Sequence, residues 1–261
     1  MVLSHRVALN AVQLDDLDSR ITIDNVLEDT GKDTINAVGF GGRDGQRITQ
    51  RRRDYLDVTV KFKIDIRKHF MSEREEVLEA VNAWAMAGGW LTVNYKPGRK
   101  LRVVCVKLAA VGDAWEWTRQ YEITFRAYGV PYWQEENAAS VTFRGNSGVL
   151  TVNGSAPTVA EVEFGNTSGG TINAVTISCG ASQMTFGSLG LLSGEVLVID
   201  HDDTGLLRIR IRSVTGVYRS AMAARTASSA DDMFVNPGAV TCVYSPSWTA
   251  WCVVRANGRW L

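Results

Sequence analysis

The feature that most constrains this chain is an eleven-residue run, residues 56–66, in which apolar and polar residues alternate without interruption. The apolar positions are Leu56, Val58, Val60, Phe62, Ile64 and Ile66. Successive side chains of a β-strand point to opposite faces, so a period of two predicts a strand with one buried and one solvated face. We therefore expect a β-sheet in this part of the chain.

A helix and further strands are predicted to follow this strand. The sequence Ser72-Glu73-Arg74-Glu75 has the pattern of a capping box, an apolar stripe at helical spacing runs over residues 77–85, and Gly88-Gly89 is expected to end the helix. Extended segments are predicted at residues 90–95, 101–108 and 115–125, with a turn at 96–99 between the first two. These elements predict an antiparallel sheet or barrel that carries one helix.

The charge of the sequence changes near residue 138. Residues 1–137 hold 20 Lys+Arg and 20 Asp+Glu, whereas residues 138–261 hold eight Arg, eight Asp+Glu and no Lys. Two domains, 1–137 and 138–261, explain this change most simply. Short strands are predicted in the second domain at 141–144, 149–152, 158–164, 171–178, 196–200, 206–212, 240–244 and 251–255. Their regular spacing without a helical stripe favours a β-sandwich.

Charge and hydropathy exclude several classes of function. The chain has 28 Lys+Arg and 28 Asp+Glu, hence no net charge that would draw it to nucleic acid or to an anionic membrane. No run of 18 apolar residues is present, and the first residues lack the pattern of a signal peptide. We expect a soluble protein made in a cytosol, with no specific nucleic-acid binding and no membrane insertion. Reduced core thiols are expected at Cys105, Cys179, Cys242 and Cys252.

The sequence predicts no catalytic, cofactor-binding or metal-binding residues. The glycine-rich segment 39–45 lacks the third glycine of a dinucleotide-binding loop, and the three histidines lie in separate segments. Asp200-His201-Asp202-Asp203 contains ligand types for a divalent ion, but a polar turn needs the same residues, and we expect a turn. The hypothesis is therefore that this is not an enzyme.

An arginine cluster precedes the alternating strand and offers a candidate interface. Arginine side chains flank residues 48–50 in what we predict to be a loop, 39–53, that enters the strand. One interpretation is a solvated basic loop. The other is a contact with an acidic partner surface, because guanidinium groups pair well with carboxylates across interfaces. The candidate interface residues are Arg43, Arg47, Arg51, Arg52 and Arg53.

The order of these parts resembles that of siphophage distal tail proteins, the hub components of phage baseplates. In the first domain the resemblance is carried by Gly88-Gly89-Trp90, the Pro97-Gly98 hairpin, the run from Trp117 to Ala127, and Pro131-Tyr132-Trp133. In the second domain it is carried by Leu197-Val198-Ile199-Asp200, Asn236-Pro237-Gly238 and Arg259-Trp260-Leu261. The resemblance spans nearly the whole chain.

The resemblance implies a mainly β fold, with an N-terminal split β-barrel carrying one α-helix and a C-terminal galectin-like β-sandwich. It also implies a homo-oligomer: a six-fold ring of first domains that joins the tail tube protein to the baseplate and tail-tip proteins, with a channel for DNA. Such a protein is made in the host cytoplasm and resides at the phage tail tip. The alternative is a carbohydrate-binding virion protein whose sandwich recognises a host-surface glycan during adsorption. A third alternative, a glycan-degrading tail enzyme, would require an essential carboxylate that the sequence does not single out.

Overall fold

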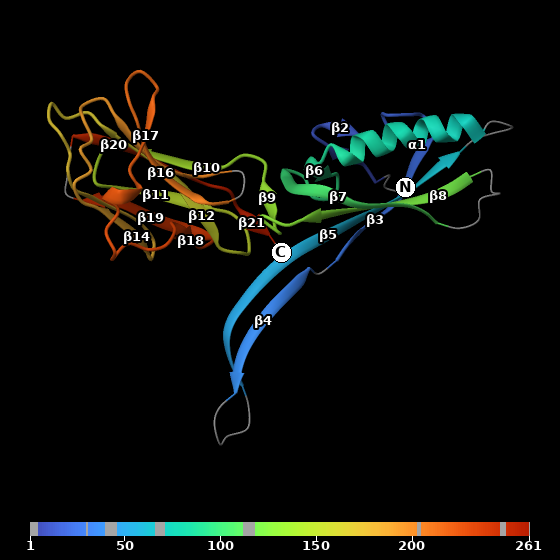
Figure 1. Cartoon of the computed structure of the whole chain (residues 1–261), viewed down its shortest axis with the longest axis horizontal. Coiled ribbons are helices and arrows are strands. Elements are labelled where there is room, and N and C mark those ends of the chain that lie inside the picture. Colours follow the sequence, from blue (N-terminus) through green and yellow to red (C-terminus); the bar gives the residue numbers. More distant parts are fainter. Residues whose placement is uncertain are drawn as a thin grey trace. The chain divides into compact units, whose positions relative to one another are not determined.

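The computed structural model describes residues 5–29, 31–39, 46–65, 71–111, 118–202, 205–245 and 249–260. These residues are mainly in β-strands, with one α-helix, which confirms the predicted fold class (Figure 1). The chain divides into two units, Met1–Trp133 and Gln134–Leu261, and each is described by itself. None of the described helices is long and apolar enough to cross a membrane.

Unit 1 is an antiparallel sheet with a helix. Its elements are β1 (Val7–Leu9), β2 (Val12–Gln13), β3 (Ile21–Glu28), β4 (Lys32–Gly39), β5 (Gln46–Asp65), α1 (Met71–Met86), β6 (Gly89–Val93), β7 (Arg99–Val111) and β8 (Thr118–Ala127). The strand order is β2-β1-β6-β7-β8-β5-β3, and β4 pairs with β5 beside this path. No pairing of described strands joins β2 to β3, so these strands form an open sheet and not a closed barrel.

Strand β5 confirms the prediction made from the alternating run, and it begins ten residues before that run, at Gln46. Its apolar residues Val58, Val60 and Phe62 are fully buried, and each lies opposite an apolar or aromatic residue of β8. The Phe62 ring stacks on Tyr121 with 5.5 Å between centroids. Ile66 lies outside the described residues. The alternation therefore marks the part of β5 that has a core face.

Helix α1 buries one stripe and exposes the opposite face. Val81 and Ala85 are fully buried, and Trp84 packs edge-on against Phe125 with ring centroids 5.8 Å apart. The Trp84 indole N–H donates to the Val12 carbonyl at 3.0 Å, so the polar end of this buried ring is satisfied. The helix begins at Met71, one residue before Ser72, so the predicted cap residue lies inside its first turn.

Two glycines bound the segments after α1 as the sequence predicts. Gly88 follows the helix with φ at +59°, a left-handed conformation that favours glycine at a helix end. Gly98 has φ at +70° in the turn between β6 and β7. The predicted strand over 115–125 is β8, which begins at Thr118; Trp115 and Trp117 lie outside the described residues.

Unit 2 contains two antiparallel sheets. Its strands are β10 (Ala139–Phe143), β11 (Ser147–Val152), β12 (Thr158–Asn166), β13 (Val175–Cys179), β14 (Ser182–Phe186), β15 (Val196–His201), β16 (Leu207–Arg212), β17 (Tyr218–Ser220), β18 (Phe234–Val235), β19 (Gly238–Ser245), β20 (Ala250–Ala256) and β21 (Arg259–Trp260), with a 3-10 helix at Met222–Ala224. The short strand β9 (Trp133–Glu135) begins with the last residue of unit 1. The larger sheet has the order β10-β20-β12-β15-β16-β17, and the smaller one β11-β19-β13-β14. Each of the eight predicted strand segments overlaps one of these strands.

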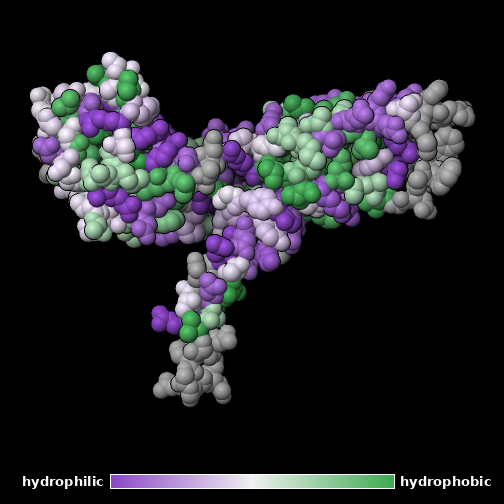
Figure 2. Space-filling model, in the orientation of Figure 1, coloured by the Kyte–Doolittle hydropathy of each residue, from purple (hydrophilic) through white to green (hydrophobic). Residues whose placement is uncertain are grey.

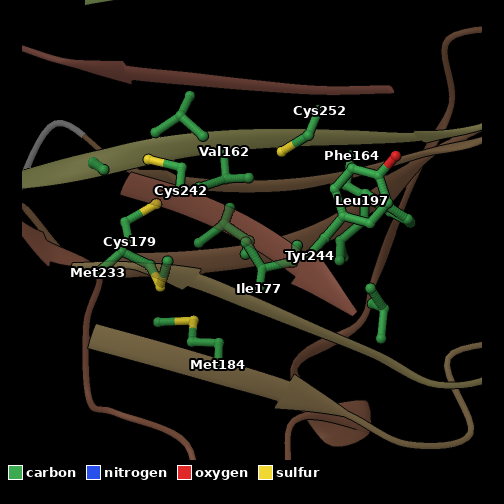
Figure 3. Close-up of a cluster of buried hydrophobic side chains, with 14 of the residues drawn as sticks. Val162, Phe164, Ile177, Cys179, Met184, Leu197, Met233, Cys242, Tyr244 and Cys252 are labelled. Atoms are coloured by element: carbon green, nitrogen blue, oxygen red, sulfur yellow. The ribbon is translucent and has the colours of Figure 1, made fainter. Parts of the chain in front are cut away.

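The inner faces of the two sheets of unit 2 share one hydrophobic core (Figure 3). Phe164 of the larger sheet meets Tyr244 of the smaller one edge-on, with ring centroids 5.2 Å apart. The Tyr244 hydroxyl donates to backbone carbonyls, 3.2 Å from that of Arg144 and 3.3 Å from that of Ala250. This packing of sheet on sheet is the predicted sandwich.

Three of the four cysteines lie in this core, as the sequence predicts. Cys179, Cys242 and Cys252 are fully buried free thiols, and Cys179 lies directly opposite Cys242 on neighbouring strands (Figure 3). Burial raises the pKa of Cys252 to about 12, which keeps this thiol protonated and unreactive. Cys105, in unit 1, is only half-buried.

Two leucines of unit 1 test where its core ends. Leu101 in β7 is fully buried, whereas Leu27 in β3 is 43% exposed. We expect Leu101→Ala to lower the free energy of unfolding by about 2–5 kcal/mol, because it leaves a cavity. Leu27→Ala should lower it by only about 0.5 kcal/mol. Urea denaturation of both variants measures the difference, and equal losses would contradict this core boundary.

Candidate interaction surface

The most unusual feature of unit 1 is a two-stranded ribbon that leaves its sheet. Strand β4 pairs with residues 46–55 of β5, from Gly39 opposite Gln46 to Lys32 opposite Tyr55. We call these two segments the arm. Figure 1 shows the arm, in blue, running away from the sheet. Among described strands β4 pairs with β5 alone, so both edges of the arm are open.

The predicted loop over residues 39–53 is therefore wrong where the structure describes it, since residues 46–53 belong to β5. The physical reason is cross-strand pairing with β4, which satisfies the backbone hydrogen bonds of a segment whose side chains are mostly polar. Residues 40–45, including Arg43, lie outside the described residues.

The arm exposes apolar side chains on both faces. Ile35 and Ile48 are 52% and 60% exposed, and Val38 is 59% exposed. The register places Ala37 opposite Ile48 and Val38 opposite Arg47. Figure 2 shows hydrophobic and hydrophilic residues side by side along the arm. A two-stranded ribbon is only marginally stable alone, and exposed apolar side chains of this kind make the arm a candidate interaction surface.

The candidate arginines of the arm differ in their surroundings. Arg53 is largely buried: its Nε donates to Asp33 at 3.3 Å, and its guanidinium lies 5.4 Å from the centre of the Tyr132 ring. Arg52 pairs with Asp54 at 3.1 Å but its side chain stays 69% exposed. Arg47 is exposed, with no ion-pair partner among the described residues. Arg53 thus holds the arm together, while Arg47 and Arg52 face solvent; the side chain of Arg51 is not described.

The base of the arm is fixed by a carboxylate that the sequence did not single out. Glu28, the last residue of β3, accepts hydrogen bonds from the Tyr95 hydroxyl and the Lys96 ammonium, each at 2.6 Å, and from the Trp133 indole at 3.1 Å. Burial and this carboxylate raise the pKa of Tyr95, which keeps the phenol protonated as the donor. Three donors from distant segments converge here, and spacing in the sequence gives no sign of that.

A second cluster holds the adjacent part of β5. Arg126 of β8 donates to both Asp57 carboxylate oxygens, at 2.6 and 2.7 Å, and lies 3.9 Å from the centre of the Tyr55 ring. The hydrogen bonds to Asp57 raise the pKa of Arg126 further above its already high value. Two-point pairing of this kind restricts orientation as well as distance. Together, the Glu28 and Asp57 clusters fix the direction in which the arm leaves the sheet.

The segment weighed as a metal site has other roles in unit 2. Asp200 pairs with Arg208 and Arg210, and Asp202 accepts the backbone N–H of Leu206 at 3.0 Å within a turn. His201 pairs with Asp232 at 2.8 Å. Asp203 is not described. No group of three or more potential ligands that could hold a metal ion occurs in the parts of the chain that the structure describes.

The outward face of the larger sheet carries paired charges. Glu163 of β12 pairs with Arg255 at 2.9 Å and with Arg212 at 3.5 Å. With the Asp200 pairs, all three alternating arginines of β16 thus have carboxylate partners, on β15 for Arg208 and Arg210 and on β12 for Arg212. Such pairs orient side chains on a half-exposed face and contribute little stability each.

The fold is similar to that of a solved phage protein. The structure of the SPP1 Dit (gp 19.1) protein, described as a paradigm of the hub adsorption apparatus in phages that infect Gram-positive bacteria, matches with a TM-score of 0.74 at 12% identity. The match covers 99% of this chain and 100% of that one. The expected likeness to distal tail proteins is therefore confirmed at the level of the fold.

Weaker likenesses are found to two structures of the phage P2 baseplate in its activated conformation. The one with Ca has a TM-score of 0.46 at 8% identity and covers 99% of this chain and 98% of that one. The one with Sr has a TM-score of 0.48 at 8% identity and covers 97% of each chain. No protein-family model and no curated protein sequence matches the chain.

The pair of His201 and Asp232 gives the stability of the fold a pH dependence. The hydrogen bond to Asp232 raises the pKa of His201 above its ordinary value. A pKa that is higher in the folded state stabilises the fold at pH below about 6.5, and this contribution is lost as the pH rises through the raised pKa. We expect Asp232→Asn to abolish the loss of stability that this pair causes in the wild type over the pH range above about 6.5.

Urea denaturation across that range measures the effect. Asp231→Asn is the matched control, because the neighbouring Asp231 side chain is fully exposed and pairs with Arg225 at 3.4 Å, not with His201. A pH profile of Asp232→Asn identical to that of the wild type would contradict the assignment.

Proposed function

We propose that this protein is a structural component of a phage tail. Six copies form a ring through unit 1, join the tail tube protein to the baseplate and tail-tip proteins, and leave a channel for DNA. The observation that carries the proposal is the likeness of the whole chain, through both units, to the SPP1 hub protein. The protein is made in the host cytoplasm, acts at the tail tip by assembly and catalyses no reaction.

The arm supports self-association of unit 1. A closed ring needs two different surfaces on each copy, because each subunit contacts its neighbours head to tail. The arm is one such surface, since it is a paired, exposed ribbon whose direction is fixed at its base by the Glu28 cluster. We assign the ring contacts to the arm and to residues 40–45, with Arg43, Arg47, Arg51, Arg52 and Arg53.

The solution mass of the purified chain tests the proposal. Six copies of a 28.6 kDa chain amount to about 172 kDa, and we expect light scattering to give this mass at micromolar concentration. Negative-stain electron microscopy of the same sample should show rings with a central channel. A mass that stays at 28.6 kDa over the whole accessible concentration range would contradict self-association.

The carbohydrate-binding alternative rests on one residue of unit 2. Trp251 of β20 lies directly against Gly165, where a Cβ atom would come within 2.2 Å of the indole ring, and it remains half-exposed on the outward face of the larger sheet. Exposed aromatic rings offer flat apolar surfaces that sugars can cover. The arginines nearby are already paired, which leaves few free polar groups for a sugar.

A glycan array probed with the full-length chain separates the two functions. If the sandwich recognises a host-surface glycan, we expect binding that Trp251→Ala lowers by about tenfold or more, whereas Phe234→Ala, which removes another exposed aromatic ring of unit 2, leaves it unchanged. No binding to any glycan would favour the hub alone.

A further inference from the structure

We propose that the arm of one copy binds the outer face of helix α1 of a neighbouring copy, through the arm face that carries Arg47 and Arg52. This inference rests on the proposed ring and names the two surfaces that meet in it. It assigns a role to α1 beyond covering its own sheet.

The first argument is the distribution of charge along the sequence. Four of the 28 Lys and Arg residues lie within seven residues of the arm, 47–53, and four of the 28 Asp and Glu residues lie within seven residues of α1, 73–79. Counting all charged residues, the arm (32–39 and 46–55) has five cations and two carboxylates, a net charge of +3. Helix α1 has one arginine and four glutamates, a net charge of −3. The two segments are thus opposite in sign and equal in magnitude.

The second argument is that much of this charge has no partner within one chain. On the helix, Glu73 pairs with Arg20 at 2.8 Å and Glu76 also interacts with the Arg20 charge, whereas Glu75 and Glu79 are exposed without ion-pair partners among the described residues. On the arm, Arg53 is used internally by Asp33, whereas Arg47 is exposed and unpaired in the same described part of the chain. The free charges of the two surfaces are therefore available to each other.

The third argument is the shape of the surfaces. The register puts Val38 opposite Arg47 and Thr34 opposite Arg52, so one face of the arm carries both arginines and an exposed valine. After its acidic turns the outer face of α1 continues with the exposed small residues Ala80 and Ala83. Small side chains there allow a flat ribbon to approach closely, with Val38 against the alanines and the arginines toward the glutamates.

The contact has to be between two copies. In Figure 1 the arm runs away from the sheet of unit 1, whereas α1 lies along that sheet, well apart from the arm. The Glu28 and Asp57 clusters hold the arm in that direction. The arm therefore cannot reach the helix of its own copy and contacts the helix of the next one. Such a contact is head-to-tail, the kind that closes a ring.

Two charge-reversed variants test the contact. One is Arg47→Glu with Arg52→Glu on the arm, and the other is Glu75→Arg with Glu79→Arg on the helix. Each variant alone places like charges in every contact, so we expect its assembly to weaken by about tenfold or more, as measured by sedimentation velocity. Arg144→Glu reverses an exposed charge of unit 2 as the matched control, and its assembly should equal that of the wild type.

An equimolar mixture of the two variants gives the decisive result. In an alternating ring every reversed arm meets a reversed helix, and every native arm meets a native helix, so all contacts are again attractive. We expect the mixture to recover the wild-type mass, which also shows that both variants are folded.

Three results would overturn the inference. Variants that assemble like the wild type would show that the charges do not meet, and a mixture that stays dissociated would show that they meet other surfaces; in either case the ring itself stands. A wild-type chain that stays monomeric would instead refute the proposed self-association and the inference with it.

Discussion

The structure of unit 1 depends on one continuous strand, half of which lies in the sheet and half in the arm. Strand β5 pairs with β8 from Leu56 to Asp65 and with β4 from Gln46 to Tyr55, so its backbone hydrogen bonds pass from sheet to arm without a gap. The sheet half buries Val58, Val60 and Phe62 completely, whereas the arm half exposes Ile48. Because a paired strand is stiff along its length, the buried half determines where the exposed half points.

This arrangement separates the source of stability from the surface available for contacts. The sheet half of β5 gains its stability from packing against Tyr121, Ile123 and Phe125 of β8 and from the helix above them. The arm gains little from burial and is held by polar contacts at its base, at Glu28 and at Asp57. Side chains along the arm are thus free to serve recognition without loss of the core.

The sequence predicts those strands and helices that bury one face in a core. The alternation of residues 56–66 reveals β5 because one face is buried, and the apolar stripe over 77–85 reveals α1 for the same reason. The arm has no buried face, so apolar and polar residues do not alternate along its strands. Three successive arginines, Arg51, Arg52 and Arg53, are instead typical of a polar loop. In unit 2 eight strands are predicted, whereas β14, a five-residue strand in which three residues are polar, and the three-residue strand β17, exposed throughout, are not.

The candidate residues show the same limit. The type of residue points to interaction, but only the fold separates Arg53, which is used inside the arm, from Arg47 and Arg52, which face solvent. The Glu28 cluster is formed by residues up to 105 positions apart in the sequence, so no local sequence pattern predicts it. Asp200 and Asp202 are likewise residue types that can bind a metal ion. In the fold, however, Asp200 pairs with arginines of the next strand, and Asp202 accepts a backbone hydrogen bond within a turn.

The irregular pairing of the arm has a consequence for how assembly stops. The register of β4 against β5 shifts twice, between Lys32 and Asp33 and between Asn36 and Ala37. Such bulges twist a ribbon and interrupt the row of backbone donors and acceptors along its edges, and charged side chains beside them discourage strand addition. An open edge of this kind is a poor template for amyloid-like growth. Copies that meet through side chains, at an angle set by the arm, can close on a fixed number of subunits, whereas copies that meet by adding strands would continue into a fibre.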